Sequence, residues 1–200
     1  MTPKQTERLK KEITKIKRAL AADKRRWGGY YDDSQGLRYL PPELYLKLED
    51  YTGALRYFNW FEKNFPDDEA FPVFLFEWTV TLFKTNRLQK AATKAFETYC
   101  SNIYLLAYFL QHELPNPDIK YSSNWSSPEL TKHLPYKKEQ NNLTDFTDWL
   151  EEVVASQRFK DFSQQYIDIQ IQLKEESPGP KRSALVERQY TLLDDFDQAT

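Results

Sequence analysis

The hydrophobic positions of this chain recur mostly three and four residues apart, which is the spacing of amphipathic helices. The first such segment runs from Thr2 to about Arg26, and its opening threonine, proline and glutamine are arranged as in a capping box. Its apolar positions form a narrow seam of Leu9, Ile13, Ile16 and Leu20. We therefore expect a long N-terminal helix that packs through one face only.

Two later segments share one design, which is a helix, a short polar turn and a second helix entered through a small residue. They are residues 44–68 and 73–102, and aligning Ala54 with Ala91 shifts the sequence by 37 residues. A small side chain allows two antiparallel helices to cross closely. The chain is therefore expected to contain two copies of one helical hairpin, as in proteins built from stacked repeats.

This pattern resembles the tetratricopeptide repeat (TPR), a family of stacked helical hairpins whose concave face binds peptides or proteins. The residues that carry the resemblance are Tyr45, Asp50, Tyr51, Ala54, Phe58 and Pro66-Asp67-Asp68 in the first copy, and Leu75, Trp78, Leu82, Leu88, Ala91 and Ala95 in the second. Pro41-Pro42 and Phe61 depart from the family pattern, and Ile103 stands where the second copy would have its closing proline. The resemblance covers about residues 35–102 and implies a divergent α-α superhelix of two to three repeats.

The resemblance also implies where a partner would lie, because the first helix of each hairpin lines the concave face in this family. The expected partner-binding residues are Tyr39, Glu43, Leu46 and Lys47 from the first copy, and Phe76, Glu77, Val80, Phe83 and Lys84 from the second. Their mixture of rings and charges suits an extended or helical peptide. The alternative is that the chain's own N-terminal or C-terminal helix fills this groove.

The remaining segments complete an all-α chain. The expected divisions are a basic N-terminal helix over 1–26, helical repeats over 27–112, an irregular linker over 113–141 and a C-terminal helical subdomain over 142–200. The apolar run Ile103–His112 is either the first helix of a third repeat or a cap on the second. Trp125 lies in the proline-rich linker, where its side chain either packs within the protein or contacts a partner. Asn142 is expected to cap the next helix.

Composition agrees with an ordered helical protein, because the chain has 5 Trp, 13 Tyr and 13 Phe but only 5 Gly. The net charge of −2 gives no global attraction to nucleic acid or to an anionic membrane. Ten Lys and Arg against three acidic residues nevertheless give residues 4–26 a charge of +7, which leaves −9 for the rest. That helix is expected to dock on the acidic body, and the alternatives are a nucleic-acid or ribosome contact and dimerisation.

The aromatic loop Trp27–Leu40 either packs over a core edge or forms a recognition surface.

No set of residues indicates catalysis. His112 and His133 are far apart in the sequence, Cys100 lies in an apolar helical context, and the paired aspartates lie at turns or helix ends, where capping explains them. We expect no catalytic residue, no metal and no cofactor. No apolar run reaches the roughly 18 residues of a membrane span, and the N-terminus is polar and Lys-rich, so a cytoplasmic location is expected.

The function expected from the sequence is therefore a non-catalytic protein–protein interaction module, a TPR-like adaptor or scaffold that binds an unidentified protein or peptide. One alternative is a nucleic-acid or ribosome-associated protein that uses the basic N-terminal helix. Another is a small immunity or inhibitor protein.

Overall fold

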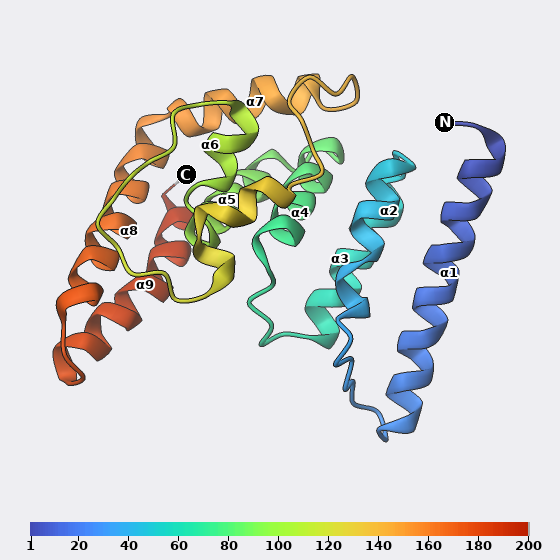
Figure 1. Ribbon diagram of the computed structural model, residues 1–200, viewed down its shortest axis with the longest axis horizontal. Coiled ribbons are helices and arrows are strands. Elements are labelled where there is room, and N and C mark those ends of the chain that lie inside the picture. The colour runs from blue at the N-terminus through green and yellow to red at the C-terminus, as the bar shows by residue number, and fades with distance from the viewer. Residues whose placement is uncertain (200) are drawn as a thin grey trace. The chain divides into compact units, whose positions relative to one another are not determined.

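The structure is a computed structural model that describes residues 1–199, and over that range the chain is all-helical (Figure 1). It divides into two compact units, of which the first comprises Met1–Glu69 and the second begins at Ala70. This division falls inside the segment 27–112 and separates the two predicted hairpins. Within residues 1–199, no helix has both the length and the apolar character needed to cross a membrane.

The first unit is built on a long N-terminal helix. Its elements are α1 (Pro3–Arg26), the 3-10 turn η1 (Leu37–Tyr39), α2 (Pro41–Lys47) and α3 (Tyr51–Asn64). The predicted capping box is present, since the Thr2 hydroxyl accepts from the Gln5 amide at 3.3 Å and the Gln5 side chain accepts from the Thr2 amide at 2.8 Å. Helix α1 packs against α2 and η1 (Figure 1). Ile13, Ile16 and Leu20 of the seam are buried.

The end of α1 depends on two glycines. The Gly29 amide donates to the carbonyl of Lys24 at 2.8 Å, and both Gly28 and Gly29 have positive φ angles, of 63° and 106°. Glycine adopts this left-handed backbone without the steric cost that a Cβ would impose. The sequence Gly28-Gly29 therefore ends the helix at the predicted place.

The second unit contains the remaining helices. They are α4 (Pro72–Lys84), α5 (Leu88–Ser101), α6 (Leu105–Leu110), the 3-10 turns η2 (Asn124–Ser126) and η3 (Pro128–His133), α7 (Thr144–Ala155), α8 (Gln157–Glu175) and α9 (Pro180–Gln198). Helix α5 packs against α4 and also against the α8–α9 pair, while α7 packs against α4 and α8. The Phe96 ring stacks on Phe196 at 4.4 Å and meets Phe159 edge-on at 5.7 Å, so aromatic contacts join α5 to the C-terminal helices.

The two hairpins, α2–α3 and α4–α5, repeat the same local geometry at the predicted offset of 37 residues. Helices α3 and α5 each have 14 residues, and the turns before them place Glu49 and Asn86 in the left-handed region, at φ 55° and 58°. The next amide in each turn reaches back five residues, from Asp50 to the Tyr45 carbonyl at 3.0 Å and from Arg87 to Leu82 at 2.9 Å. Both first helices thus end in a Schellman motif.

The predicted small residues lie inside these hairpins. Ala54 in α3 and Ala91 in α5 are both 0% exposed. Neither position has room for a larger side chain without displacement of its neighbours, because protein interiors are close-packed. This burial is the physical basis of the alignment that the sequence suggested.

One local expectation is wrong, and one pair of alternatives is narrowed by the structure. Asn142 does not cap a helix, because α7 begins at Thr144 and the Thr147 amide donates to the carbonyl of Leu143 at 2.8 Å. The apolar run Ile103–His112 forms only the short helix α6, which ends at Leu110 and is followed by the C-cap residue Gln111 with φ 60°. Residues 112–123 then carry no helix, so α6 does not begin a third hairpin of the expected form, whereas its packing against α5 fits the alternative of a cap on the second repeat.

Candidate functional site

The nine residues that the sequence assigned to partner binding lie in both units. Five of them are on α4, in the second unit. Phe76 and Val80 are 0% exposed, and Glu77 is 3% exposed, so these three side chains are not accessible to a partner in this structure. Phe83 and Lys84, at the end of α4, are half-buried.

Aromatic rings from later in the chain cover this face of α4. The ring of Phe76 stacks on Tyr136 at 5.5 Å and meets Phe146 of α7 edge-on at 5.6 Å. Phe83 lies 5.0 Å from the ring of Trp149, also on α7. Ring pairs at such distances add about 0.5–1.5 kcal/mol each beyond the area they bury. The second unit therefore fills this part of its predicted groove with its own α7 and with Tyr136.

Polar contacts fix the covering segments in register with α4. The Tyr136 hydroxyl donates to a carboxylate oxygen of Glu77 at 2.7 Å, in the buried interior. At the end of the helix, the Lys84 ammonium pairs with the Asp145 carboxylate. Partial burial raises the pKa of Asp145, but the hydrogen bond and the charge of Lys84 lower it more, so that this pKa falls below its ordinary value.

The other four predicted residues are in the first unit. Tyr39 lies in η1, and its hydroxyl donates to the Asp68 carboxylate at 2.6 Å. The guanidinium of Arg38 bridges two carboxylates, with Nε 2.8 Å from Asp68 and a terminal nitrogen 3.0 Å from the buried Asp33. Burial, followed by the hydrogen bond to Asp68, raises the pKa of Tyr39 to about 12. These contacts give Tyr39 a structural role, because they tie the loop before α2 to the segment after α3.

Helix α2 presents a smaller accessible surface than the sequence suggested. Leu46 is buried at 3% exposure, whereas Glu43 and Lys47 form an i,i+4 ion pair at 2.5 Å whose side chains are 36% and 51% exposed. Leu40, just before α2, is 47% exposed. Leu40, Glu43 and Lys47 are together named the α2 surface.

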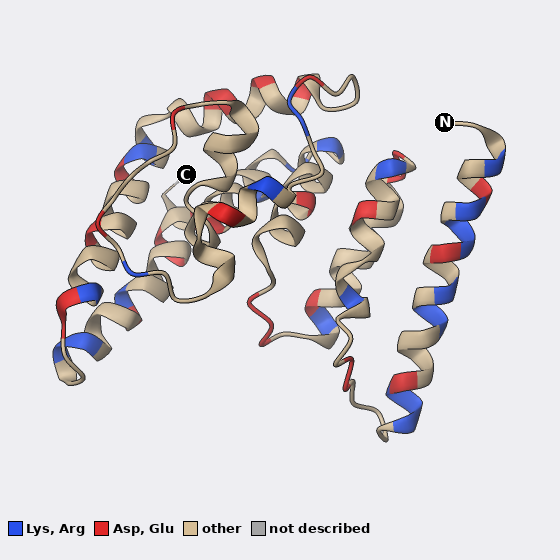
Figure 2. Cartoon of the chain, viewed as in Figure 1, with Lys and Arg blue, Asp and Glu red and all other residues tan. Residues whose placement is uncertain are grey.

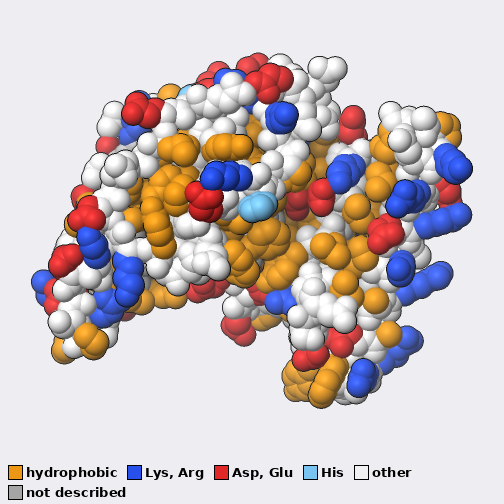
Figure 3. Space-filling model, viewed as in Figure 1, with side chains coloured by type: hydrophobic (Ala, Val, Ile, Leu, Met, Phe, Trp, Pro, Cys, Tyr) orange, Lys and Arg blue, Asp and Glu red, His pale blue; other side chains and the backbone are white. Residues whose placement is uncertain are grey.

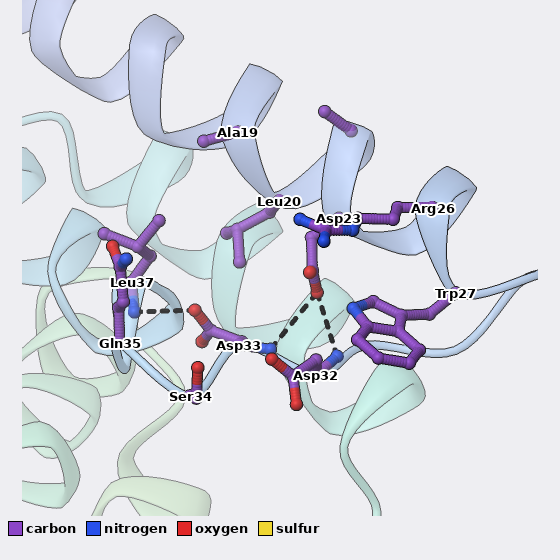
Figure 4. Close-up of a pocket in the computed structure, with 11 residues that line it drawn as sticks. Ala19, Leu20, Asp23, Arg26, Trp27, Asp32, Asp33, Ser34, Gln35 and Leu37 are labelled. Atoms are coloured by element: carbon purple, nitrogen blue, oxygen red, sulfur yellow. Dashed lines mark hydrogen bonds between the residues drawn. The ribbon is translucent and has the colours of Figure 1, made fainter.

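A hollow of about 490 Å³ lies beside the C-terminal end of α1, between this helix and the loop that follows it (Figure 4). The Asp23 carboxylate points across it and accepts from the backbone amides of Asp32 at 2.9 Å and Asp33 at 3.2 Å. Asp33 in turn accepts from the Leu37 amide at 2.9 Å. Asp33 therefore caps a turn, as the sequence indicated, and its carboxylate also binds Arg38.

The residues capable of metal or nucleophilic chemistry lie in ordinary structural contacts. Over residues 1–199, no three His, Cys, Asp or Glu side chains are grouped so that they could hold a metal ion. His112 lies 2.9 Å from a carboxylate oxygen of Glu151. Burial, with a smaller effect from the charge of Glu97, raises the pKa of the Cys100 thiol well above its usual value, which disfavours the nucleophilic thiolate.

Sequence reasoning missed the residues that cover α4. The three-residue spacing of Phe146 and Trp149 is that of one helix face, but periodicity does not say which other helix such a face meets. Tyr136 lies in an irregular, proline-containing segment, and nothing local marks it as the donor to Glu77. Comparison with known proteins adds no further assignment, since no protein-family model matches the sequence and searches of curated proteins and of solved structures found no match.

Proposed function

We propose that the protein is a non-catalytic, TPR-like interaction module of the cytoplasm that binds a protein or peptide partner. The observation that carries this proposal is the repeated hairpin. Two helix–turn–helix units, 37 residues apart, share Schellman turns at Glu49 and Asn86 and a fully buried alanine at the same position, Ala54 or Ala91. Repeats of this kind serve as scaffolds for extended binding surfaces.

The contacts of α4 support a binding role for the first helix of a hairpin. Helix α7 lies on α4 through Phe146 and Trp149, which are three residues apart on one face. This is the helix-in-groove mode by which amphipathic peptides are recognised, here used within one chain. In the first unit, α1 already packs against α2 and Leu46 is buried, so a partner would contact the part of α2 that remains exposed.

The α2 surface has features that suit the binding of a partner. The Glu43–Lys47 pair is exposed, and exposed pairs contribute only about 0–1 kcal/mol, so that a partner can engage either charge at little cost. Leu40 supplies an adjacent apolar contact. We propose a peptide segment with one apolar side chain and a charged group beside it as the ligand of this surface.

The test is affinity capture from the native host with the wild-type chain and with Lys47→Glu. Lys47 is a cleaner choice than Lys84, because replacing Lys84 would also break its pair with Asp145. The matched control is Lys63→Glu, which makes the same charge change at an exposed position of α3. We expect a protein that the wild type and the control retain and that Lys47→Glu releases.

The captured protein is then purified and titrated against all three variants, with circular dichroism as a check of folding. An affinity that is weaker for Lys47→Glu alone would support the α2 surface. Equal affinities for all three variants would reject it, and the absence of any specifically retained protein would count against the adaptor function itself.

A further inference from the structure

The outward face of α1 carries a line of cations that the hairpins do not use. We name this line the basic stripe. It consists of Lys4, Arg8, Lys11, Lys15, Arg18 and Arg25, all of them exposed. Successive members are three, four or seven residues apart, so they share one side of the helix, and that side lies opposite the buried seam. Figure 2 marks the Lys and Arg positions along α1, and Figure 3 shows Lys and Arg side chains on the side of this helix away from α2.

The basic stripe is scarcely neutralised by the protein. Among residues 1–199, its one ion pair joins Lys11 to Glu7 at 3.7 Å, and both side chains are more than half exposed. Exposed pairs of this kind contribute little, because water and salt screen them. The stripe therefore presents several unpaired positive charges over about 31 Å, at a rise of 1.5 Å per residue from Lys4 to Arg25.

Two exposed aromatic rings follow directly at the end of this helix. Trp27 is 51% exposed and Tyr30 is 80% exposed, on either side of the Gly28-Gly29 turn. The guanidinium of Arg26 lies 6.0 Å from the centre of the Trp27 ring. Large rings exposed beside a line of cations combine a surface for base stacking with a surface for phosphates.

From this arrangement we propose that the basic stripe binds the phosphodiester backbone of a nucleic acid, and that Trp27 and Tyr30 stack on its unpaired bases. Charge complementarity supports this ligand, because a row of exposed Lys and Arg side chains can neutralise several phosphates of one polyanion. Binding depends on the local charge of α1, so the net charge of −2 does not oppose it. The site is separate from the α2 surface and does not depend on the proposed partner there.

A membrane surface fits these observations less well. Helices that lie in a membrane interface bury an apolar face among the lipids. In α1, that face is already committed, because Ile13, Ile16 and Leu20 are 6%, 5% and 1% exposed. The outward face carries cations but no large apolar side chain that could insert.

The test is a titration of fluorescent oligonucleotides with the full chain. Binding is measured by fluorescence anisotropy at several salt concentrations. The probes are a DNA duplex of about 20 base pairs, roughly twice the length of α1, and single-stranded DNA and RNA of equal length. Vesicles that contain phosphatidylserine form the lipid arm. The stripe variant is Arg8→Gln/Lys15→Gln/Arg18→Gln, and Lys63→Gln/Lys137→Gln/Lys160→Gln is the control with the same net charge.

We expect the wild type and the control to bind the oligonucleotides, and the stripe variant to bind them about tenfold more weakly or worse at about 50 mM salt. The slope of log affinity against log salt should become shallower by about 0.9 for each duplex phosphate that the variant no longer neutralises. The comparison of DNA with RNA then shows which polymer the site prefers.

Three results would overturn the proposal. They are the failure of the wild type to bind any oligonucleotide, equal weakening in the stripe variant and the control, and binding to vesicles without binding to oligonucleotides. The stacking role has its own test in Trp27→Ala/Tyr30→Ala, which should weaken binding to the single strands more than to the duplex. An equal effect on both would reject stacking. Circular dichroism confirms that each variant is folded.

Discussion

The hydroxyl of Tyr136 donates a hydrogen bond of 2.7 Å to the carboxylate of Glu77, a residue 59 positions earlier in the chain. Both side chains are buried, at 8% and 3% exposure. Removing a hydrogen bond to a charged group costs about 1.5–3 kcal/mol, more when a buried partner loses its donor. Tyr136→Phe should therefore lower the free energy of unfolding by about 2 kcal/mol, measured in urea by near-UV circular dichroism.

The control for this prediction is Tyr108→Phe, which removes a hydroxyl from a residue that is 40% exposed. Such surface changes usually stay within about 0.5 kcal/mol. If both variants unfold at the same urea concentration as the wild type, the Tyr136–Glu77 bond does not hold the linker segment on α4.

The buried alanine of the second hairpin offers a test of its close helix crossing. Ala91→Leu places a larger side chain where the residue is 0% exposed and α4 packs against α5. Overpacking of this kind costs about 1–3 kcal/mol. Thermal unfolding should show a lower midpoint for this variant, and no comparable decrease for Ala184→Leu, which makes the same change at an exposed position of α9. If Ala91→Leu had the same unfolding midpoint as the wild type, α4 and α5 would have to accommodate the larger side chain without a loss of stability.

The Lys84–Asp145 pair should give stability a specific dependence on pH. The pKa of Asp145 is lower in the folded chain than its ordinary value of 3.8, so the pair stabilises the fold above that value and ceases to do so as the pH falls through the folded pKa. Because the Asp145 side chain is 62% exposed, the contribution is only about 0.2–1 kcal/mol.

The variant Asp145→Asn should therefore be less stable than the wild type at about pH 6, and this difference should be smaller at about pH 3. Urea titrations at the two pH values measure this difference. Asp148→Asn, at an exposed position of the same helix, should show no such convergence. If the variant lost the same free energy of unfolding at both pH values, the charge of Asp145 would not be the source of that loss.

Cys100 should be slow to react with thiol reagents while the protein is folded. Part of the residue reaches the surface, but burial of the thiol raises its pKa, and the thiolate is the reactive form. Alkylation by iodoacetamide at about pH 8, near the ordinary thiol pKa, should be much slower in the folded chain than in urea. Ala184→Cys in a Cys100→Ala background supplies an exposed thiol for comparison. Equal rates for the two folded proteins would show that Cys100 is accessible.

Local structure could be predicted from the sequence wherever the signal is itself local. The capping box at Thr2, the seam through Ile13 and Ile16, and the hairpin offset that aligns Ala54 with Ala91 all depend on residues within a few turns of one another. Each appears in the structure because backbone hydrogen bonds and helical periodicity act over three to five residues. The all-α class follows from the same kind of pattern.

The surroundings of the candidate site could not be predicted in this way. The sequence shows Phe76 on a helix but not that Tyr136 and Phe146 cover it, since contacts between segments 60 or more residues apart leave no local pattern. Glu77 was expected to bind a partner because the resemblance to the TPR implies that it lies on the concave face. In the structure, Glu77 is buried, and its carboxylate accepts a hydrogen bond from the Tyr136 hydroxyl.

The covering of α4 by α7 has a consequence during synthesis, because α4 is made before the helix that covers it. Lys84 and Asp145, which join α4 to α7, are 61 residues apart. At about 5–20 residues per second, the ribosome needs on the order of several seconds to make that distance. During this interval α4 and α5 can already pair, because they are adjacent in the sequence, while the rings of Phe76 and Phe83 still lack α7. Synthesis from the N-terminus therefore exposes an aromatic helix face before the segment that covers it exists.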